Sequence, residues 1–205
     1  MEKFNYNTDR LVIVSYPMGA GGKFLINCLG VSDNACLQDW ELYNLSSIEK
    51  KQLILDRLSA TPYGTWNDLE LGCFKMFEYN VDGLTADEIH QIEFGFQTII
   101  DISNNNKYFF QTTHTEKDHE QLCCAFPNAT TINFTNSRSI HRNICKPIRD
   151  DLTVHSDYTF DVDNYNNIPK LLEDIRMFYS IFGMQDFDNE FVTKYYLSWQ
   201  DKING

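Results

Sequence analysis

A glycine-rich turn followed by a lysine is the stretch of the chain best suited to chemistry. The turn comprises Gly19, Ala20, Gly21 and Gly22, and it leads directly into Lys23. Glycines let backbone N–H groups converge on an anion, a helix N-terminus adds partial positive charge, and a lysine supplies a full charge. The anion that such a turn suits best is a phosphate.

The sequence on both sides of this turn predicts a strand, a loop and a helix. An apolar run at residues 11–14 precedes it, and a helix-like segment at residues 24–29 follows. The pattern G-x-x-x-x-G-K-[ST] of phosphate loops keeps Gly22 and Lys23, whereas Pro17 replaces its first glycine and Phe24 its hydroxyl residue. That hydroxyl ligates Mg²⁺ beside a nucleoside triphosphate, so Phe24 argues against magnesium-dependent triphosphate chemistry. The alternative interpretation is an ordinary strand-to-helix turn that needs glycine for tight packing.

Further strands and helices must position this turn. Helices are predicted at residues 46–59, 85–101 and 118–126, and strands at residues 107–113 and 129–135. Alternating strands and helices predict a parallel sheet with right-handed crossovers, in which ligands bind at the carboxyl ends of the strands. Lys23, His114 and Arg138 each follow a strand, so we expect all three at the same edge of the sheet.

The remaining segments are expected to connect these elements and to cover the sheet. Residues 31–40 are predicted to form a connection, and residues 149–167 a polar loop. Residues 66–77 fit either a short helix or an irregular packed segment. Two helices, at residues 168–182 and 188–202, are predicted to close the chain. No repeat or linker divides the sequence, so residues 1–205 are predicted to form a single α/β domain with three layers, helices on both sides of a central parallel sheet.

Composition limits the partners and the compartment. The formal net charge of −12 argues against nucleic acid or an anionic membrane as a partner. The six cysteines form no C-x-x-C pair and are predicted to be buried, reduced thiols. The N-terminus lacks the apolar core of a signal peptide, and no apolar run is long enough to span a membrane. We therefore expect a soluble cytoplasmic protein.

His114 has more than one interpretation from the residues alone. A histidine at the end of a strand is often only a hydrogen-bonded structural residue. His114, Glu116, Asp118 and His119 also form a dense cluster that could bind a metal. Their spacing matches no two-histidine metal motif, so a solvated polar turn is the preferred interpretation of this cluster.

Three stretches taken together resemble the sulfotransferase family. Ser15-Tyr16-Pro17 and the loop through Lys23 are similar to that family's strand and loop for the 5′ end of its donor. Thr112-Thr113-His114 resembles its K-T-H motif at a strand end. Phe126-Pro127-Asn128-Ala129 and the strand that follows resemble its F-P-N-A-K segment. The closing helix, with Tyr195, Tyr196 and Trp199, is a weaker fourth likeness.

The resemblance implies a P-loop-type fold of the kind found in nucleoside triphosphate hydrolases and sulfotransferases. It further implies a donor, 3′-phosphoadenosine 5′-phosphosulfate, and transfer of its sulfuryl group to a hydroxyl or amine of an acceptor that the sequence does not identify. His114 would be the catalytic base, and Lys23 would stabilise charge on the donor's phosphate with no metal required. The residues implied to bind the donor are Pro17, Met18, Gly19, Ala20, Gly21, Gly22, Lys23, Phe24, Asn136, Arg138 and Arg142.

Two positions depart from the family's pattern. Asn136 stands where the family has an arginine and Ile144 where it has a serine, so Arg138 or Arg142 is the candidate for the missing charge beside a 3′-phosphate. Two other functions remain open. One is a P-loop kinase for a nucleotide or small molecule, and the other is a binding or assembly protein that keeps the fold without catalysis.

Overall fold

A parallel sheet forms the centre of the protein in this computed structural model, which describes residues 8–17, 20–36, 45–60, 101, 104, 106–135 and 152–204. Within these residues the sheet has five strands in the order β2-β3-β1-β4-β5, and every neighbouring pair is parallel. The strands are β1 (Leu11–Ser15), β2 (Ala35–Cys36), β3 (Tyr108–Thr113), β4 (Thr130–Thr135) and β5 (Tyr158–Asp161). The predicted parallel α/β sheet is thus confirmed.

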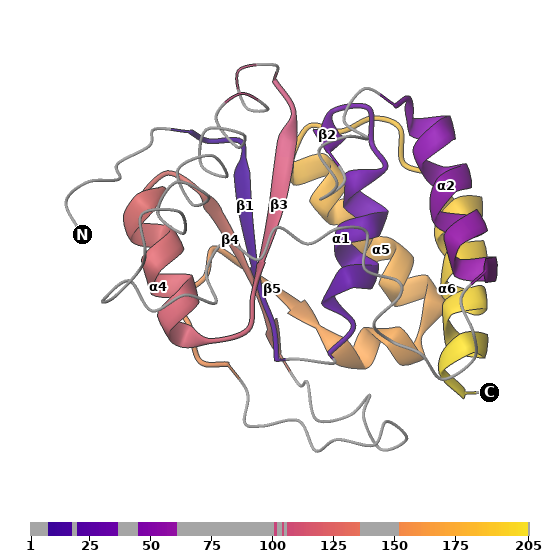
Figure 1. Ribbon diagram of the computed structural model, residues 1–205. Coiled ribbons are helices and arrows are strands. Elements are labelled where there is room, and N and C mark those ends of the chain that lie inside the picture. The colour runs from indigo at the N-terminus through magenta and orange to yellow at the C-terminus, as the bar shows by residue number, and fades with distance from the viewer. Residues whose placement is uncertain are drawn as a thin grey trace.

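Helices cover both faces of this sheet. They are α1 (Gly22–Gly30), α2 (Ser47–Ala60), α4 (Glu116–Ala125), α5 (Ile168–Ile181) and α6 (Asn189–Asn204), with a 3-10 helix, η4 (Val162–Asn166), after β5. Figure 1 shows α4 on one side of the strands and α1, α2, α5 and α6 on the other. The described elements therefore form three layers.

The two faces of the sheet differ in chemistry. The face toward α1 and α5 is apolar and rich in aromatic rings, and from the strands it buries Val12, Val14, Phe110, Ile132, Phe134 and Phe160. The face toward α4 buries polar side chains along the strands, namely Ser15, Gln111, Thr113, Thr131 and Asn133. Because successive strand residues point to opposite faces, this difference follows from the alternation of residue types along each strand.

The strand order creates a switch point at the carboxyl end of β1. From β1 the chain passes through α1 toward β2, whereas from the neighbouring strand β3 it passes through α4 to β4 on the other side. These two connections leave adjacent strands in opposite directions and run over opposite faces. In open α/β sheets a ligand crevice forms at such a point. The topology therefore indicates a ligand site at the carboxyl ends of β1 and β3, at the lower edge in Figure 1.

Several predicted helix ends are confirmed at the level of hydrogen bonds. Glu49 Oε2 accepts from the backbone N–H of Ser46 at 2.8 Å and forms a capping box at the start of α2, where the helix predicted at residues 46–59 begins. Asp188 Oδ1 accepts from the N–H of Phe191 at 2.9 Å and caps α6. Gly183, with φ of 63°, ends α5 in the left-handed conformation that favours glycine.

Other expectations were wrong. Residues 31–40 contain β2, a strand too short to produce an alternating pattern, and residues 149–167 contain β5 and η4. The Asp161 side chain accepts from the N–H of Asp163 and starts η4, so an aspartate taken for a loop residue is a helix cap. The predictions for residues 66–77 and 85–100 lie outside the described residues.

Candidate functional site

The loop after β1 begins with a turn that is anchored to β3. The N–H of Tyr16 donates to the Thr113 carbonyl at 3.1 Å, and the N–H of Ala20 donates to the Pro17 carbonyl at 3.0 Å. α1 then starts at Gly22 with Gly21 as its N-cap residue. Gly21 has no side chain to cap the helix, and no acidic residue lies in the first turn. The positive end of α1 is thus directed at this edge of the sheet without a capping side chain from Gly21.

Packing explains why residues 21 and 22 are glycines. Gly21 has φ of 79°, and a Cβ there would lie 3.1 Å from the Tyr165 ring and 3.2 Å from the Trp199 ring. A Cβ on Gly22 would lie 2.2 Å from the Tyr16 ring, a distance that real structures do not tolerate. Neither glycine therefore requires a ligand to account for it. This is the tight-packing role that the sequence left open as an alternative.

Phe24 faces the core. Its ring is 1% exposed and stacks on Tyr195 with ring centroids 4.8 Å apart. The rings of Tyr165, Tyr196 and Trp199 also contact it. Phe24 is therefore a packing residue of α1, and the expectation that it binds a donor has no support in these contacts. The same contacts show that the closing helix α6 packs directly behind the loop.

His114 lies against the start of the loop. It directly follows β3, and its Nδ1 is 3.0 Å from the carbonyl oxygen of Tyr16. Its ring meets the Tyr16 ring edge-on, with centroids 4.7 Å apart. Since a carbonyl oxygen only accepts, Nδ1 must carry the proton, and the basic lone pair of the neutral ring is on Nε2. This hydrogen bond thus assigns the proton of the neutral His114 ring to Nδ1.

Lys23 is the second residue of α1 and is partly exposed. It and His114 follow neighbouring strands, because Ser15 and Thr113 are paired in the register of β1 and β3. The prediction that both residues lie at the carboxyl edge of the sheet is confirmed. Arg138, the third residue expected there, lies outside the described residues, as do Met18, Gly19, Asn136 and Arg142.

A buried polar network that the sequence did not reveal lies behind this edge, on the α4 face. Ser15 Oγ is 2.8 Å from Thr113 Oγ1 and 2.8 Å from His119 Nδ1. His119 belongs to α4, as the helix predicted at residues 118–126 implied, and the N-cap of α4 is Thr115. The interpretation of its cluster as a solvated turn was wrong, because His119 is only 5% exposed. Burial lowers the pKa of His119. The signal that could have revealed it is the helical spacing of His119, Leu122 and Ala125, the buried residues of α4.

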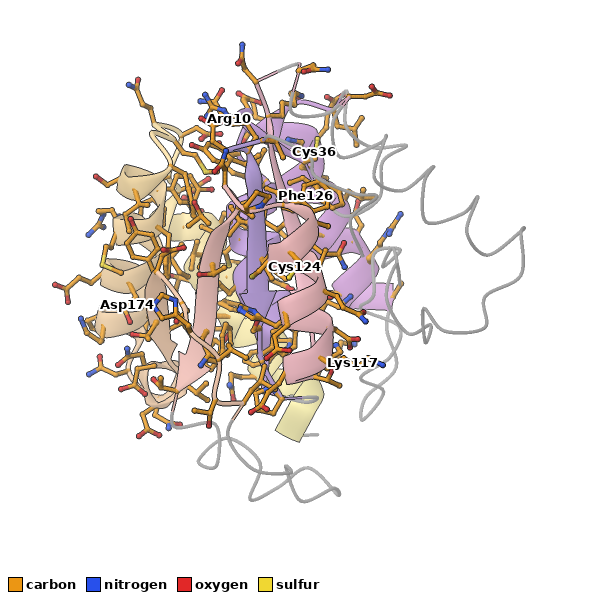
Figure 2. The ribbon with its side chains drawn as sticks, turned by 90° about the vertical axis from the view of Figure 1, so that its left-hand side faces the viewer. Arg10, Cys36, Lys117, Cys124, Phe126 and Asp174 are labelled. Atoms are coloured by element: carbon orange, nitrogen blue, oxygen red, sulfur yellow. The ribbon has the colours of Figure 1, made fainter. Side chains whose placement is uncertain are left out.

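A pocket of about 540 Å³ lies along the side of α4. Its lining includes His119, Cys123 and Cys124 from the helix and His155 and Asp157 from the segment before β5. Figure 2 shows α4 with Lys117 near its start, Phe126 beyond its end and Cys124 between them. Cys124 is exposed, contrary to the expectation of buried thiols. Burial is the main reason that the pKa of the Cys123 thiol rises to about 11, so that thiol is protonated and a weak nucleophile at neutral pH.

Of the other described cysteines, Cys28 and Cys36 are buried as predicted and Cys123 is partly buried, and no disulfide joins any of the four that the structure describes. Within the same residues, no group of three or more His, Cys, Asp or Glu side chains could hold a metal ion. No helix there is long and apolar enough to cross a membrane.

Comparisons of the chain with protein families, with curated proteins and with solved structures found no match. The case for a function therefore depends on the residues and geometry described above.

Proposed function

We propose that the protein is a sulfotransferase-like enzyme of P-loop type that transfers a sulfuryl group from 3′-phosphoadenosine 5′-phosphosulfate to a hydroxyl or amine. One observation carries the proposal. His114, with its proton held on Nδ1 by the Tyr16 carbonyl, lies at the switch point of the sheet beside the loop that leads into Lys23. A base and a cation at this point are what sulfuryl transfer to a neutral acceptor requires.

The roles of the two residues follow from charge. His114 Nε2 would take the proton from the acceptor as the acceptor's oxygen or nitrogen forms its bond to sulfur. The bond between sulfur and the donor's bridging oxygen breaks, and adenosine 3′,5′-bisphosphate leaves with the electron pair. Lys23 and the first N–H groups of α1 would stabilise that leaving phosphate. In an overall acidic protein, a lysine and a helix N-terminus at the same edge of the sheet would favour an anion there.

The described contacts do not support the kinase alternative. A magnesium-dependent P-loop kinase needs a hydroxyl directly after the loop lysine. Phe24 occupies that position, and its side chain is packed among the aromatic rings of α6 and η4.

A binding or assembly protein without catalysis is the second candidate. The observation that favours it is the packing role of Gly21 and Gly22, which accounts for both glycines without a ligand. Under this alternative His114 would be structural, with its hydrogen bond to Tyr16 linking β3 to the loop.

Thermal unfolding with two ligands separates these functions. A ligand present at about 100 times its dissociation constant stabilises the fold by about 2.7 kcal/mol. We expect adenosine 3′,5′-bisphosphate to raise the melting temperature, Lys23→Ala to remove the shift, and Lys194→Ala, which removes an exposed lysine of α6, to retain it. A shift produced only by ATP with Mg²⁺ would favour the kinase, and no shift with either ligand would favour the non-catalytic alternative.

A further inference from the structure

Two tyrosines from the C-terminal part of the chain are linked to the loop by a series of hydrogen bonds. The hydroxyl of Tyr165, in η4, donates to the carbonyl oxygen of Gly21 at 2.8 Å. The hydroxyl of Tyr196, in α6, donates to the backbone carbonyl of Tyr165. Burial raises the pKa of Tyr165 well above its ordinary value, so its hydroxyl remains a donor at any pH at which the protein is used.

The surroundings hold Tyr165 in place. Its side chain is 1% exposed and packs on Phe24, Phe160 and Trp199, with ring centroids 5.3 to 5.5 Å away. A side chain held by so many contacts can keep its hydrogen-bond partner, the Gly21 carbonyl oxygen, in one position. The Gly21 oxygen also accepts from the N–H of Phe24 at 3.0 Å.

The geometry of the peptide bond transmits this constraint to the loop. The peptide between Gly21 and Gly22 is planar and trans, so its N–H points opposite to its C=O. When Tyr165 and Phe24 hold the Gly21 oxygen inward, the N–H of Gly22 must point away from the aromatic cluster. Gly21 is in the left-handed region, at φ of 79°, a conformation that glycine adopts readily.

We propose that Tyr165 is a positioning residue for the phosphate site, and that Tyr196 acts through it. By fixing the Gly21–Gly22 peptide, Tyr165 directs the Gly22 N–H and the start of α1 toward the anion before the ligand binds. Preorganised donors of this kind lower the cost of ordering the loop on binding. This inference rests on the proposed function, because it names a residue that tunes the same phosphate site.

The chain offers a matched control. Tyr179 is also almost fully buried, and its hydroxyl donates to the Cys28 carbonyl of α1 at 2.9 Å, near the opposite end of that helix. Tyr165→Phe and Tyr179→Phe thus each remove one buried hydrogen bond from a tyrosine to a backbone carbonyl. Only the first lies at the loop.

Calorimetric titration with adenosine 3′,5′-bisphosphate tests the proposal, with the melting temperature of each variant measured in parallel. We expect Tyr165→Phe to bind about three- to tenfold more weakly than wild type, and Tyr179→Phe to bind as wild type does despite a similar loss of stability. Tyr196→Phe should weaken binding less than Tyr165→Phe, and the double variant should bind no more weakly than Tyr165→Phe alone.

The outcomes distinguish this inference from the function on which it rests. If wild type binds and Tyr165→Phe binds equally well, or if Tyr179→Phe loses as much affinity, Tyr165 is only a packing residue and the inference is overturned. If Tyr165→Phe does not fold, Tyr196→Phe decides, and unchanged binding by that variant overturns the proposal. Failure of wild type to bind the bisphosphate would overturn the proposed function, and this inference with it.

Discussion

Lys50 is a buried lysine whose charge should make stability depend on pH in a predictable way. Its side chain is fully buried in α2, and Nζ donates to the carbonyls of Ser32 and Ala35 at 2.7 Å each. Burial lowers the pKa of Lys50 from its ordinary value of 10.5 to about 8, and the charge of Lys107 adds to this effect. Asp33 and Asp186 oppose it only in part.

The lowered pKa sets the sign of the effect. Between pH 8 and 10.5 the unfolded chain binds a proton at Lys50 that the folded protein has released, so the contribution of this residue to stability rises with pH. Below pH 8 the cost of keeping the charge buried is fully present, at about 3 kcal/mol. Titration of a single site with these two pKa values recovers about 2 kcal/mol of it between pH 7 and pH 9.5.

The assay is urea unfolding of wild type and Lys50→Met at both pH values. The difference in unfolding free energy between the two proteins should shift in favour of wild type by about 2 kcal/mol at the higher pH. Comparing differences removes the contributions of tyrosines and cysteines, which both proteins share. Lys51→Met, which removes the neighbouring lysine that pairs with Asp188 at 3.1 Å, controls for the change in net charge. A difference that does not change with pH would refute the account of Lys50.

Three further predictions concern the site and its support. Gly22→Ala should lower the unfolding free energy by about 2 kcal/mol, because its Cβ would overlap the Tyr16 ring. Chemical denaturation measures this loss, and a variant as stable as wild type would contradict the close packing of Gly22 on Tyr16. His114→Asn should abolish turnover of the sulfuryl donor while leaving bisphosphate affinity within about twofold of wild type, and an active variant would remove His114 from the mechanism. Because burial lowers the pKa of His119, protonation below pH 6.5 favours the unfolded chain. Wild type should therefore lose more stability than His119→Gln between pH 7 and pH 5, and the same loss of unfolding free energy in both proteins would disprove this.

The sequence predicted the parts of the fold that depend on local pattern. The buried strand at β1 and the helix caps at Glu49 and Asp188 each have a short-range signature, and all three were confirmed. β2 and β5 lack such a signature, because β2 has only two residues and β5 follows a polar segment full of aspartates. Tertiary pairing with β3 and β4 defines these strands.

In the candidate site, too, local features could be predicted from the sequence and long-range contacts could not. The position of His114 after a strand could be predicted from the residues before it, and so could its place at the edge that Lys23 shares. The partners of the loop could not, because Tyr165 and Tyr196 are distant in sequence and meet Gly21 only through the packing of η4 and α6. Gly21 and Gly22 illustrate the limit most clearly, since the same glycines fit a phosphate cradle and a tightly packed turn.

An NMR titration of the ¹⁵N-labelled protein with adenosine 3′,5′-bisphosphate tests the central claim most directly. We expect saturable changes at the amides of Gly21, Gly22 and Lys23 and at the His114 ring, with Cys124 and His155, in the pocket beside α4, unaffected. Saturable changes confined to that pocket, or none at the start of α1, would contradict a phosphate site at the end of β1.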